Sequence, residues 1–325
     1  MSSLARAEAG ANAAGGFVYG LLLVNGTLIA GMYAFAKVAG EHGITPLGLL
    51  TWQLLFAAIV IGLVAVVRGD LPALKFVNLR YAAIAGVLGI TGPNLVTFAA
   101  LKHVPAGLVG VITALSPALT YAIATLFSAE RFEPLRAAGV LLGLAGVMAI
   151  LLPRGALPDP EALPWAAAAV IAPLLLAGGN VFRSLAWPPG LRPLAAATLL
   201  LAIQALVLVP VAAVLGEFEV PRGLTGAKDL PLFGAGVLTA AFYLGAFELQ
   251  KRGGAIVVGQ IGYVITVSSL LLGALVFGER YPLTTFLAVA VVVTGIMLAN
   301  RRPCPDAVKP LPAVPAMRSH NGCTA

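Results

Sequence analysis

The chain alternates between apolar runs of about 20 residues and short polar connections, which is the pattern of a helical membrane protein. Each run is long enough for a helix that crosses the hydrocarbon core, and the connections carry the Gly and Pro residues typical of turns. The pattern predicts ten transmembrane helices, at residues 17–36, 47–67, 81–101, 104–127, 134–152, 163–182, 194–215, 230–249, 255–277 and 283–299.

Composition supports this interpretation. Hydrophobic residues make up 60% of the 325 residues and the mean hydropathy is +0.98, which is more apolar surface than a soluble core buries. The formal net charge of +7 comes from basic residues that stand singly between apolar runs. Such a distribution favours a role in membrane orientation over a nucleic-acid partner. We therefore expect an all-α integral membrane protein that is embedded in a lipid bilayer.

The chain contains an internal repeat with a fixed offset of 149 positions. Charged residues are rare here, at 10% of the sequence, so their coincidence at one offset indicates a duplication. The matching positions are Lys102 and Lys251, Gly110 and Gly259, Glu130-Arg131 and Glu279-Arg280, and Met148 and Met297. The repeat predicts an N-terminal tail at 1–16, five-helix units at 17–152 and 153–300, and a disordered tail at 301–325.

Lys and Arg residues predict the orientation of the chain. With a cytoplasmic N-terminus, 14 of the 20 Lys and Arg residues fall on the inside, as the positive-inside rule requires. Both termini are then cytoplasmic. Because each unit has five helices, an odd number, the second unit enters the membrane from the opposite face. Inverted repeats of this kind are typical of carriers that bind their substrate between the repeats, near the membrane midplane.

Ten helices in two units, each with a Lys near the turn that precedes its fourth helix and a Glu-Arg pair at that helix's end, resemble the drug/metabolite transporter superfamily, and specifically its EamA-type members. The residues that carry the resemblance most sharply are Ala129-Glu130-Arg131 and Gly278-Glu279-Arg280. The resemblance implies a carrier of amino acids, metabolites or drugs, often outward across the bacterial inner membrane. It also implies a central cavity lined by the first, third, fourth, sixth, eighth and ninth helices.

Polar side chains deep in the predicted spans mark a candidate pathway, because they are costly in lipid unless they face a partner or water. Ser and Thr usually bond to their own helix carbonyls, whereas we expect a primary amide to need another partner. Helix-end Glu130 and Glu279 are interpreted as members of structural ion pairs. The predicted substrate-binding residues are Asn25, Asn94, Asn180, Tyr243, Gln260 and Tyr263.

The sequence lacks the residues that ATP hydrolysis, enzyme catalysis and metal binding require. The sequence has no Gly-x-x-x-x-Gly-Lys-Ser/Thr motif and no nucleophile with a base inside a span, so neither ATP hydrolysis nor other enzyme activity is expected. The two cysteines lie in the C-terminal tail and suggest no metal site. No cofactor is implied. No carboxylate lies at mid-span, and Glu248 is the nearest one, so exchange or facilitated flow is favoured over proton coupling through Glu248.

The sequence therefore predicts a secondary transporter that moves a small polar metabolite, a neutral amino acid or a related compound, outward across the bacterial inner membrane. The cavity is expected to bind it through amides, hydroxyls and aromatic faces. A sugar-phosphate, nucleotide-sugar or drug carrier is the alternative, and an anion would have to use Arg183 or Lys37. A channel or scaffold is the alternative from another class. The protein is expected to be a monomer or homodimer.

Overall fold

The computed structural model describes residues 2–127, 132–151, 161–219, 221, 226, 228–259 and 261–299, with the side chains of 2–16, 147, 148, 150, 151, 247, 250–259, 263, 296 and 299 outside this description. The described residues form helices and turns and contain no strand. The helices are α1 (Ser2–Glu41), α2 (Pro46–Val67), α3 (Phe76–Gly86), the π-helix η1 (Val87–Thr91), α4 (Gly92–Leu101), α5 (Ala106–Thr113), α6 (Ser116–Leu126), α7 (Pro134–Leu151), α8 (Ala162–Ala169), α9 (Ile171–Ala186), α10 (Pro193–Val214), α11 (Asp229–Gly259), α12 (Ile261–Phe277) and α13 (Leu283–Ala299).

Seven helical segments of the described chain are long and apolar enough to cross a membrane, and three apolar stretches, Pro134–Gly146, Val264–Phe277 and Leu283–Gly295, are shorter. The outer surface of the bundle carries large apolar side chains, among them Leu63, Leu206 and Leu275, which are more than half exposed. An apolar exterior of this extent matches lipid as the solvent. The all-helical membrane fold is confirmed, while the count of ten spans stays a prediction.

The two halves repeat the same backbone turns. Gly69 ends α2 and Gly216 follows α10, both with positive φ, near 62° and 69°. The next residue in each turn, Asp70 or Glu217, donates its N–H to the carbonyl five residues earlier, at 2.8 Å in both cases. This is the Schellman ending of a helix, which favours Gly because its positive φ strains residues with a Cβ. Matching helix endings at Gly69 and Gly216, which are 147 positions apart, support the predicted duplication.

The helices that are equivalent in the two halves also pack against each other, and they run antiparallel. On α7 and α13, a Cβ at Gly146 would lie 2.9 Å from the nitrogen of Val292, and one at Gly295 would lie 2.8 Å from the Cα of Gly143. Gly143 thus contacts Gly295 and the later Gly146 contacts the earlier Val292, so the two helices run in opposite directions. Equivalent helices that cross antiparallel are related by a two-fold axis perpendicular to them, which is the geometry of inverted repeats.

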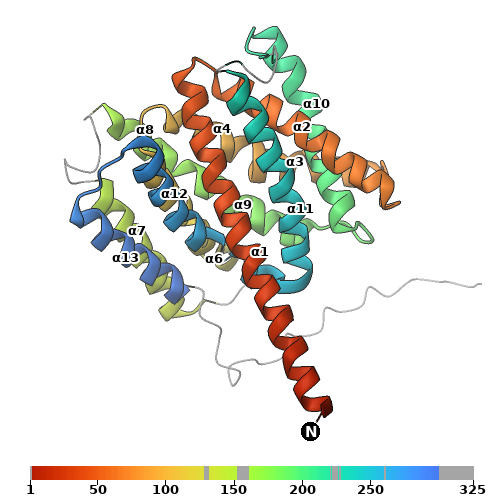
Figure 1. The fold of residues 1–325 in the computed structure, drawn as a ribbon, viewed down its shortest axis with the longest axis horizontal. Coiled ribbons are helices and arrows are strands. Elements are labelled where there is room, and N and C mark those ends of the chain that lie inside the picture. The colour runs from red at the N-terminus through yellow and green to blue at the C-terminus, as the bar shows by residue number, and fades with distance from the viewer. Residues whose placement is uncertain are drawn as a thin grey trace, which may run out of the picture.

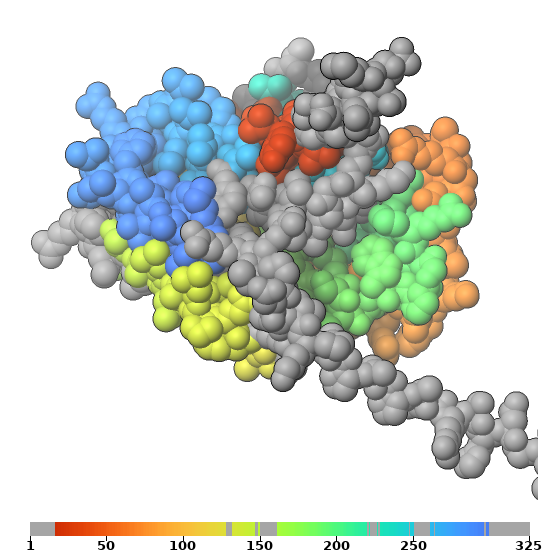
Figure 2. All heavy atoms as spheres, turned by 90° about the horizontal axis from the view of Figure 1, so that it is seen from below, coloured from red at the N-terminus to blue at the C-terminus, as the bar shows by residue number. Residues whose placement is uncertain are grey.

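The bundle is ordered by these equivalent pairs. Helices α7 and α13 lie side by side at one end of the molecule and α2 and α10 at the other, as two perpendicular views show (Figures 1 and 2). Between them, α1 packs on α11 and α12, and α9 packs on η1, α4 and α6, which is the corresponding arrangement in the other half. The Gly139-x-x-x-Gly143 motif serves the internal α7–α13 crossing, as small residues permit close helix approach.

Prolines interrupt three of the spanning segments. Pro93 has no N–H for the carbonyl of Gly89, and the helix widens there into η1, where the N–H of Gly92 bonds instead to Val87. Pro117 follows the break between α5 and α6, and Pro173 follows the break between α8 and α9. A proline removes the i−4 hydrogen bond and clashes with that carbonyl. The mid-span irregularities expected at Pro93 and Pro117 are present.

Two helices are longer than the hydrophobic pattern predicts. Helix α1 begins at Ser2 rather than near residue 17, and α11 continues to Gly259, so Lys251 lies inside a helix and not in the expected turn. Hydrophobicity marks the length of a span, but nothing in it stops a helix that continues past the membrane. The predicted C-terminal tail, residues 301–325, lies outside the described residues.

Close approach at the α7–α13 crossing predicts that Gly146→Ala destabilises the protein. The added methyl group would meet the backbone nitrogen of Val292 and the carbonyl oxygen of Ala288 at 2.9 and 3.1 Å, and overpacking of this kind costs about 1–3 kcal/mol. Thermal unfolding in detergent should show a lower midpoint. Gly62→Ala in α2, where a Cβ meets nothing within 4 Å, is the matched control. Equal midpoints for both variants would contradict the close crossing.

Candidate functional site

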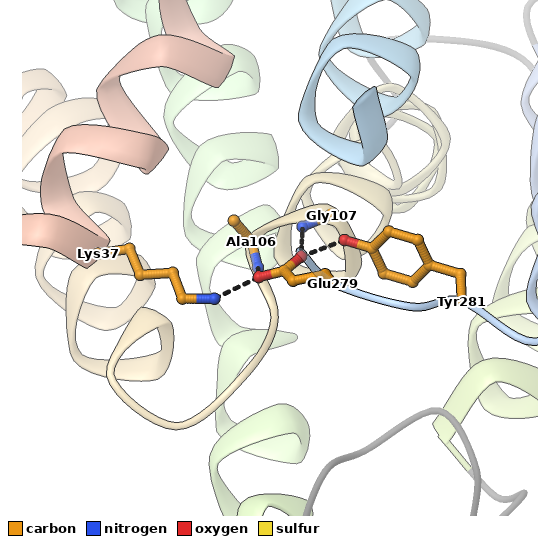
Figure 3. A network of polar contacts seen from close by, with 5 residues as sticks. All are labelled: Lys37, Ala106, Gly107, Glu279 and Tyr281. Atoms are coloured by element: carbon orange, nitrogen blue, oxygen red, sulfur yellow. Dashed lines mark hydrogen bonds and ion pairs between the residues drawn. The ribbon is translucent and has the colours of Figure 1, made fainter. Parts of the chain in front are cut away.

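A charged cluster joins the two repeats at one end of the bundle. Glu279, in the connection between α12 and α13, forms an ion pair with Lys37 near the end of α1. Its carboxylate also accepts the N–H of Ala106 at 3.0 Å and the N–H of Gly107 at 3.5 Å, both in the first turn of α5. The hydroxyl of Tyr281 donates to the other side of the same carboxylate. We call these five residues the latch (Figure 3).

The surroundings of Glu279 stabilise its charged form. Burial of this carboxyl, whose side chain is 9% exposed, would raise its pKa, but the hydrogen bonds from Lys37, Tyr281 and Ala106 outweigh burial and lower the pKa. The pKa of the Tyr281 hydroxyl is raised, by burial and then by its hydrogen bond to the carboxylate. The start of α5 adds its own partial positive charge, which favours an anion. Glu279 is therefore ionised and Tyr281 neutral at physiological pH.

Glycines make room for the latch. A Cβ at Gly107 would lie 2.8 Å from Leu270 and would also overlap the hydroxyl of Tyr281. A Cβ at Gly273 would overlap both that hydroxyl and the Glu279 carboxylate. The ammonium group of Lys37 lies 4.5 Å from the centre of the Phe277 ring, which adds a cation–π contact. The latch thus fits only because two helix surfaces lack side chains where it passes.

The expectation of an ion pair at Glu279 agrees with the structure, although its partner is Lys37 in the other repeat and not the adjacent Arg280, which is exposed. The corresponding residue of the first repeat, Glu130, lies outside the described residues. Hydrophobic patterning could not have found this pairing, because 242 positions separate the two residues. The sequence signal was a lone lysine, Lys37, directly after the first predicted span.

Asn25 and Asn94 are satisfied in part by their own helices. The amide nitrogen of Asn25 donates to the carbonyl of Leu21 at 2.7 Å, and that of Asn94 donates to Ile90 at 2.8 Å. The expectation that a primary amide needs a partner outside its helix is therefore wrong, because an Asn side chain reaches the i−4 carbonyl. Asn25 is fully buried against Gly245 of α11, and its amide oxygen has no partner. That oxygen is a free acceptor between the repeats.

Asn180 belongs to a second polar cluster. Its amide nitrogen donates to the hydroxyl of Thr120 on α6 at 3.2 Å, and its amide oxygen accepts a hydrogen bond from the guanidinium of Arg183. Two phenol rings lie within electrostatic range of this guanidinium, Tyr81 on α3 and Tyr243 on α11. The structure thus brings two of the predicted residues, Asn180 and Tyr243, to the same cation, and all three residues belong to the second repeat.

The remaining predictions have mixed outcomes. Gln260 lies outside the described residues, as does the side chain of Tyr263. The hydroxyls of Thr113, Thr120 and Thr266 bond to carbonyls four residues earlier, as expected of Thr in membrane helices. Sequence reasoning missed Tyr81 and the bond from the Tyr33 hydroxyl to Thr113 at 3.3 Å, since a tyrosine near a helix end usually anchors the membrane interface. No group of metal-binding side chains occurs among the described residues.

Repeats whose equivalent helices cross antiparallel, joined by the latch, have the architecture of inverted-repeat membrane transporters. The sequence profile of the EamA-like transporter family matches the chain twice, over residues 16–152 and 163–301. The protein belongs to this family, which is of the drug/metabolite transporter type.

Known proteins agree with this assignment. The chain is 28% identical over 281 residues to an uncharacterized inner membrane transporter, YedA, of Escherichia coli K12, covering 84% of this chain and 87% of YedA. The YedA proteins of two other E. coli strains, O6:H1 and O157:H7, match equally. One solved crystal structure of a protein shares the fold, with a TM-score of 0.57 and 23% identity over 86% of this chain and 96% of the other.

The geometry of the latch predicts that Glu279→Gln destabilises the protein by about 1.5–3 kcal/mol, the range for a hydrogen bond to a charged group. The variant leaves the Lys37 ammonium without its counterion. Unfolding midpoints in detergent would measure the loss. Arg280→Gln removes the exposed neighbouring charge and should leave the midpoint unchanged. A double-mutant cycle with Lys37→Met should show coupling between the two residues, and independent effects would contradict the ion pair.

The lowered pKa of Glu279 predicts how this stabilisation depends on pH. A carboxyl whose pKa is lower in the folded state stabilises the protein above its unfolded pKa and loses that contribution as the pH falls through the folded value. The difference in unfolding midpoint between the wild type and Glu279→Gln should therefore be constant from about pH 8 to pH 5 and shrink only in stronger acid. A difference that disappears near neutral pH would show that the carboxyl is not held ionised.

Proposed function

We propose that this protein is an alternating-access carrier that moves a small polar metabolite, a neutral amino acid or a related compound, outward across a bacterial inner membrane. The observation that carries the proposal is the latch, which ties the start of α5 and the end of α1 to the α12–α13 connection of the opposite repeat. Contacts of this kind between inverted repeats are what a carrier must make and break to alternate.

The predicted orientation of the chain places the latch on one side of the membrane. With both termini cytoplasmic, α1 runs outward and Lys37, four residues before its end, lies toward the periplasm. The latch then closes the periplasmic side, and release outward requires the ion pair to separate. The helix breaks that precede Pro117 and Pro173 provide points at which α5–α6 and α8–α9 can bend without melting a regular helix.

Substrate chemistry follows from the polar groups between the repeats. The Asn25 oxygen is a buried acceptor without a partner, and Asn94, Asn180 and Tyr243 supply further amide and phenol groups. Gln260 and Tyr263 remain in the proposed site on the grounds of sequence. A site of amides and phenols suits a small polar solute. The location of YedA in the E. coli inner membrane supports the same location for this chain.

Counterflow in liposomes tests the proposal. Purified protein should take up labelled amino acids into vesicles that contain unlabelled solute, with uptake that saturates and depends on the trapped solute. A channel or a scaffold gives no such exchange. Saturable uptake of sugar phosphates in place of amino acids would redirect the proposal to the anion carriers of the superfamily.

A double variant, Gln260→Ala with Asn94→Ala, tests where the substrate binds. Loss of two polar contacts in the proposed site should reduce the initial rate of counterflow by about fivefold or more, since each neutral hydrogen bond contributes about 0.5–1.5 kcal/mol. Thr294→Ala removes an exposed hydroxyl on α13 that bonds only to its own helix, and should transport normally. A double variant that transports as well as Thr294→Ala would place the substrate elsewhere.

A further inference from the structure

Within the described part of the bundle, Arg183 is a cation without a counterion. The described residues place no carboxylate within 4 Å of its guanidinium, and its polar neighbours are the amide of Asn180 and the phenols of Tyr81 and Tyr243. A charge buried among helices is costly unless it is paired. Lys37, the other cation expected to reach inward, is already paired with Glu279. Arg183 is thus the inward-facing cation that remains available.

The side chain of Arg183 points into the bundle and not toward lipid. On α9 the exposed residues Leu174 and Leu185 lie on one face, and at 100° per residue Arg183 lies about 180° and 200° from them. Its guanidinium approaches η1, where a Cβ at Gly89 would be 3.3 Å from Nη1. Because Gly89 has no side chain, the guanidinium of Arg183 can lie beside this part of the π-helix. Short π-helical segments within α-helices are frequent at functional sites.

Tyr81 provides an independent sign of a missing partner. Its side chain is 3% exposed, and its hydroxyl is buried with no hydrogen-bond partner. The ring is fixed by stacking on Phe182, at 5.9 Å between centroids, and by an edge contact with Trp187. Buried hydroxyls are almost always hydrogen-bonded. A donor without a partner, within electrostatic range of a cation without a counterion among the described residues, is the arrangement that a bound anion satisfies.

We propose that Arg183, Tyr81 and Asn180 form a subsite for the carboxylate of the transported solute. Arg binds a carboxylate through two parallel hydrogen bonds, the Tyr81 hydroxyl donates a further bond, and Asn180 holds the guanidinium in place. A single cation balances a single negative charge, which favours a carboxylate over a doubly charged phosphate ester. This inference rests on the proposed transport function and narrows its substrate to solutes with a carboxylate group.

Ligand-induced stabilisation tests the subsite without requiring transport. Unfolding midpoints of the purified full-length protein are measured with each of the 20 amino acids, with their primary amides, with short monocarboxylates, with glucose 6-phosphate and with phosphatidylglycerol. We expect some carboxylates to raise the midpoint of the wild type and their amides to have no effect. Arg183→Gln should raise the apparent Kd for these carboxylates by about tenfold or more. Arg183→Lys should retain part of the binding, because it keeps the charge and loses the paired geometry.

Two further variants keep the test informative. Tyr81→Phe preserves the ring packing and removes only the unpaired hydroxyl, so it should fold normally and weaken carboxylate binding several-fold. Arg192→Gln is the control, because the side chain of Arg192 is 71% exposed although it forms a salt bridge to Asp70. This variant should bind carboxylates as the wild type does. Three results would each overturn the subsite. The first is that amides bind as well as carboxylates, and the second is that only glucose 6-phosphate or phosphatidylglycerol stabilises the protein. The third is that both Arg183→Gln and Tyr81→Phe bind carboxylates as tightly as the wild type.

Counterflow separates this inference from the function on which it rests. Wild-type protein that exchanges no solute while carboxylates still bind at Arg183 would contradict the carrier and leave the subsite intact. Wild-type protein that exchanges a solute without a carboxylate, at a rate unchanged in Arg183→Gln, would support the carrier and overturn the subsite.

Discussion

Lipid offers no hydrophobic drive for one helix to pack on another, because acyl chains are as apolar as the side chains they would replace. The two repeats of this transporter must therefore be held together by close packing and by polar contacts. Glycines at the crossing of α7 and α13 bring the backbones into contact, as Gly143, Gly146 and Gly295 show. Polar side chains also join the repeats, as the hydrogen bonds from Gln53 to Thr239 and from Thr91 to Gln204 show. Everything else in the fold depends on these interfaces.

The same constraint explains where the charges lie. In a medium without water, a carboxylate is stable only if nearby donors satisfy it, and Glu279 has four, from an ammonium, a phenol and two backbone N–H groups. These donors come from both repeats, so the carboxylate keeps them only while the repeats are in contact at that face. In the proposed carrier, water would have to replace the donors when the face opens.

Arg183 is the converse case. Its guanidinium has a neutral amide and two phenols around it, and Tyr81 carries an unsatisfied hydroxyl nearby. One interface thus has its charges fully compensated and the other does not. The pseudo-two-fold axis relates the backbones of the two repeats, but it does not relate their charges, since the positions equivalent to Lys37 and Arg183 need not carry the same residue. In the proposed carrier, this asymmetry would separate the closed face at the latch from the binding region at Arg183.

The sequence by itself determined the membrane environment, the helical class, the duplication and the family. Each of these depends on local or periodic properties, namely the length of apolar runs, the composition, and charged residues such as Glu279-Arg280 that recur at one offset. Helix ends at Gly69 and Gly216 and the breaks near Pro93 and Pro117 are also local, because a single residue's backbone chemistry produces them.

Only the tertiary structure decided which polar residues meet. It paired Glu279 with Lys37 across 242 positions and satisfied the amide nitrogens of Asn25 and Asn94 within their own helices. Among the described residues it gave Arg183 no counterion and the Tyr81 hydroxyl no hydrogen-bond partner. The physical reason is that a hydrogen bond or an ion pair depends on distances of about 3 Å. Such distances are set by how helices cross, and the periodicity of one helix carries no information about the face that another presents to it.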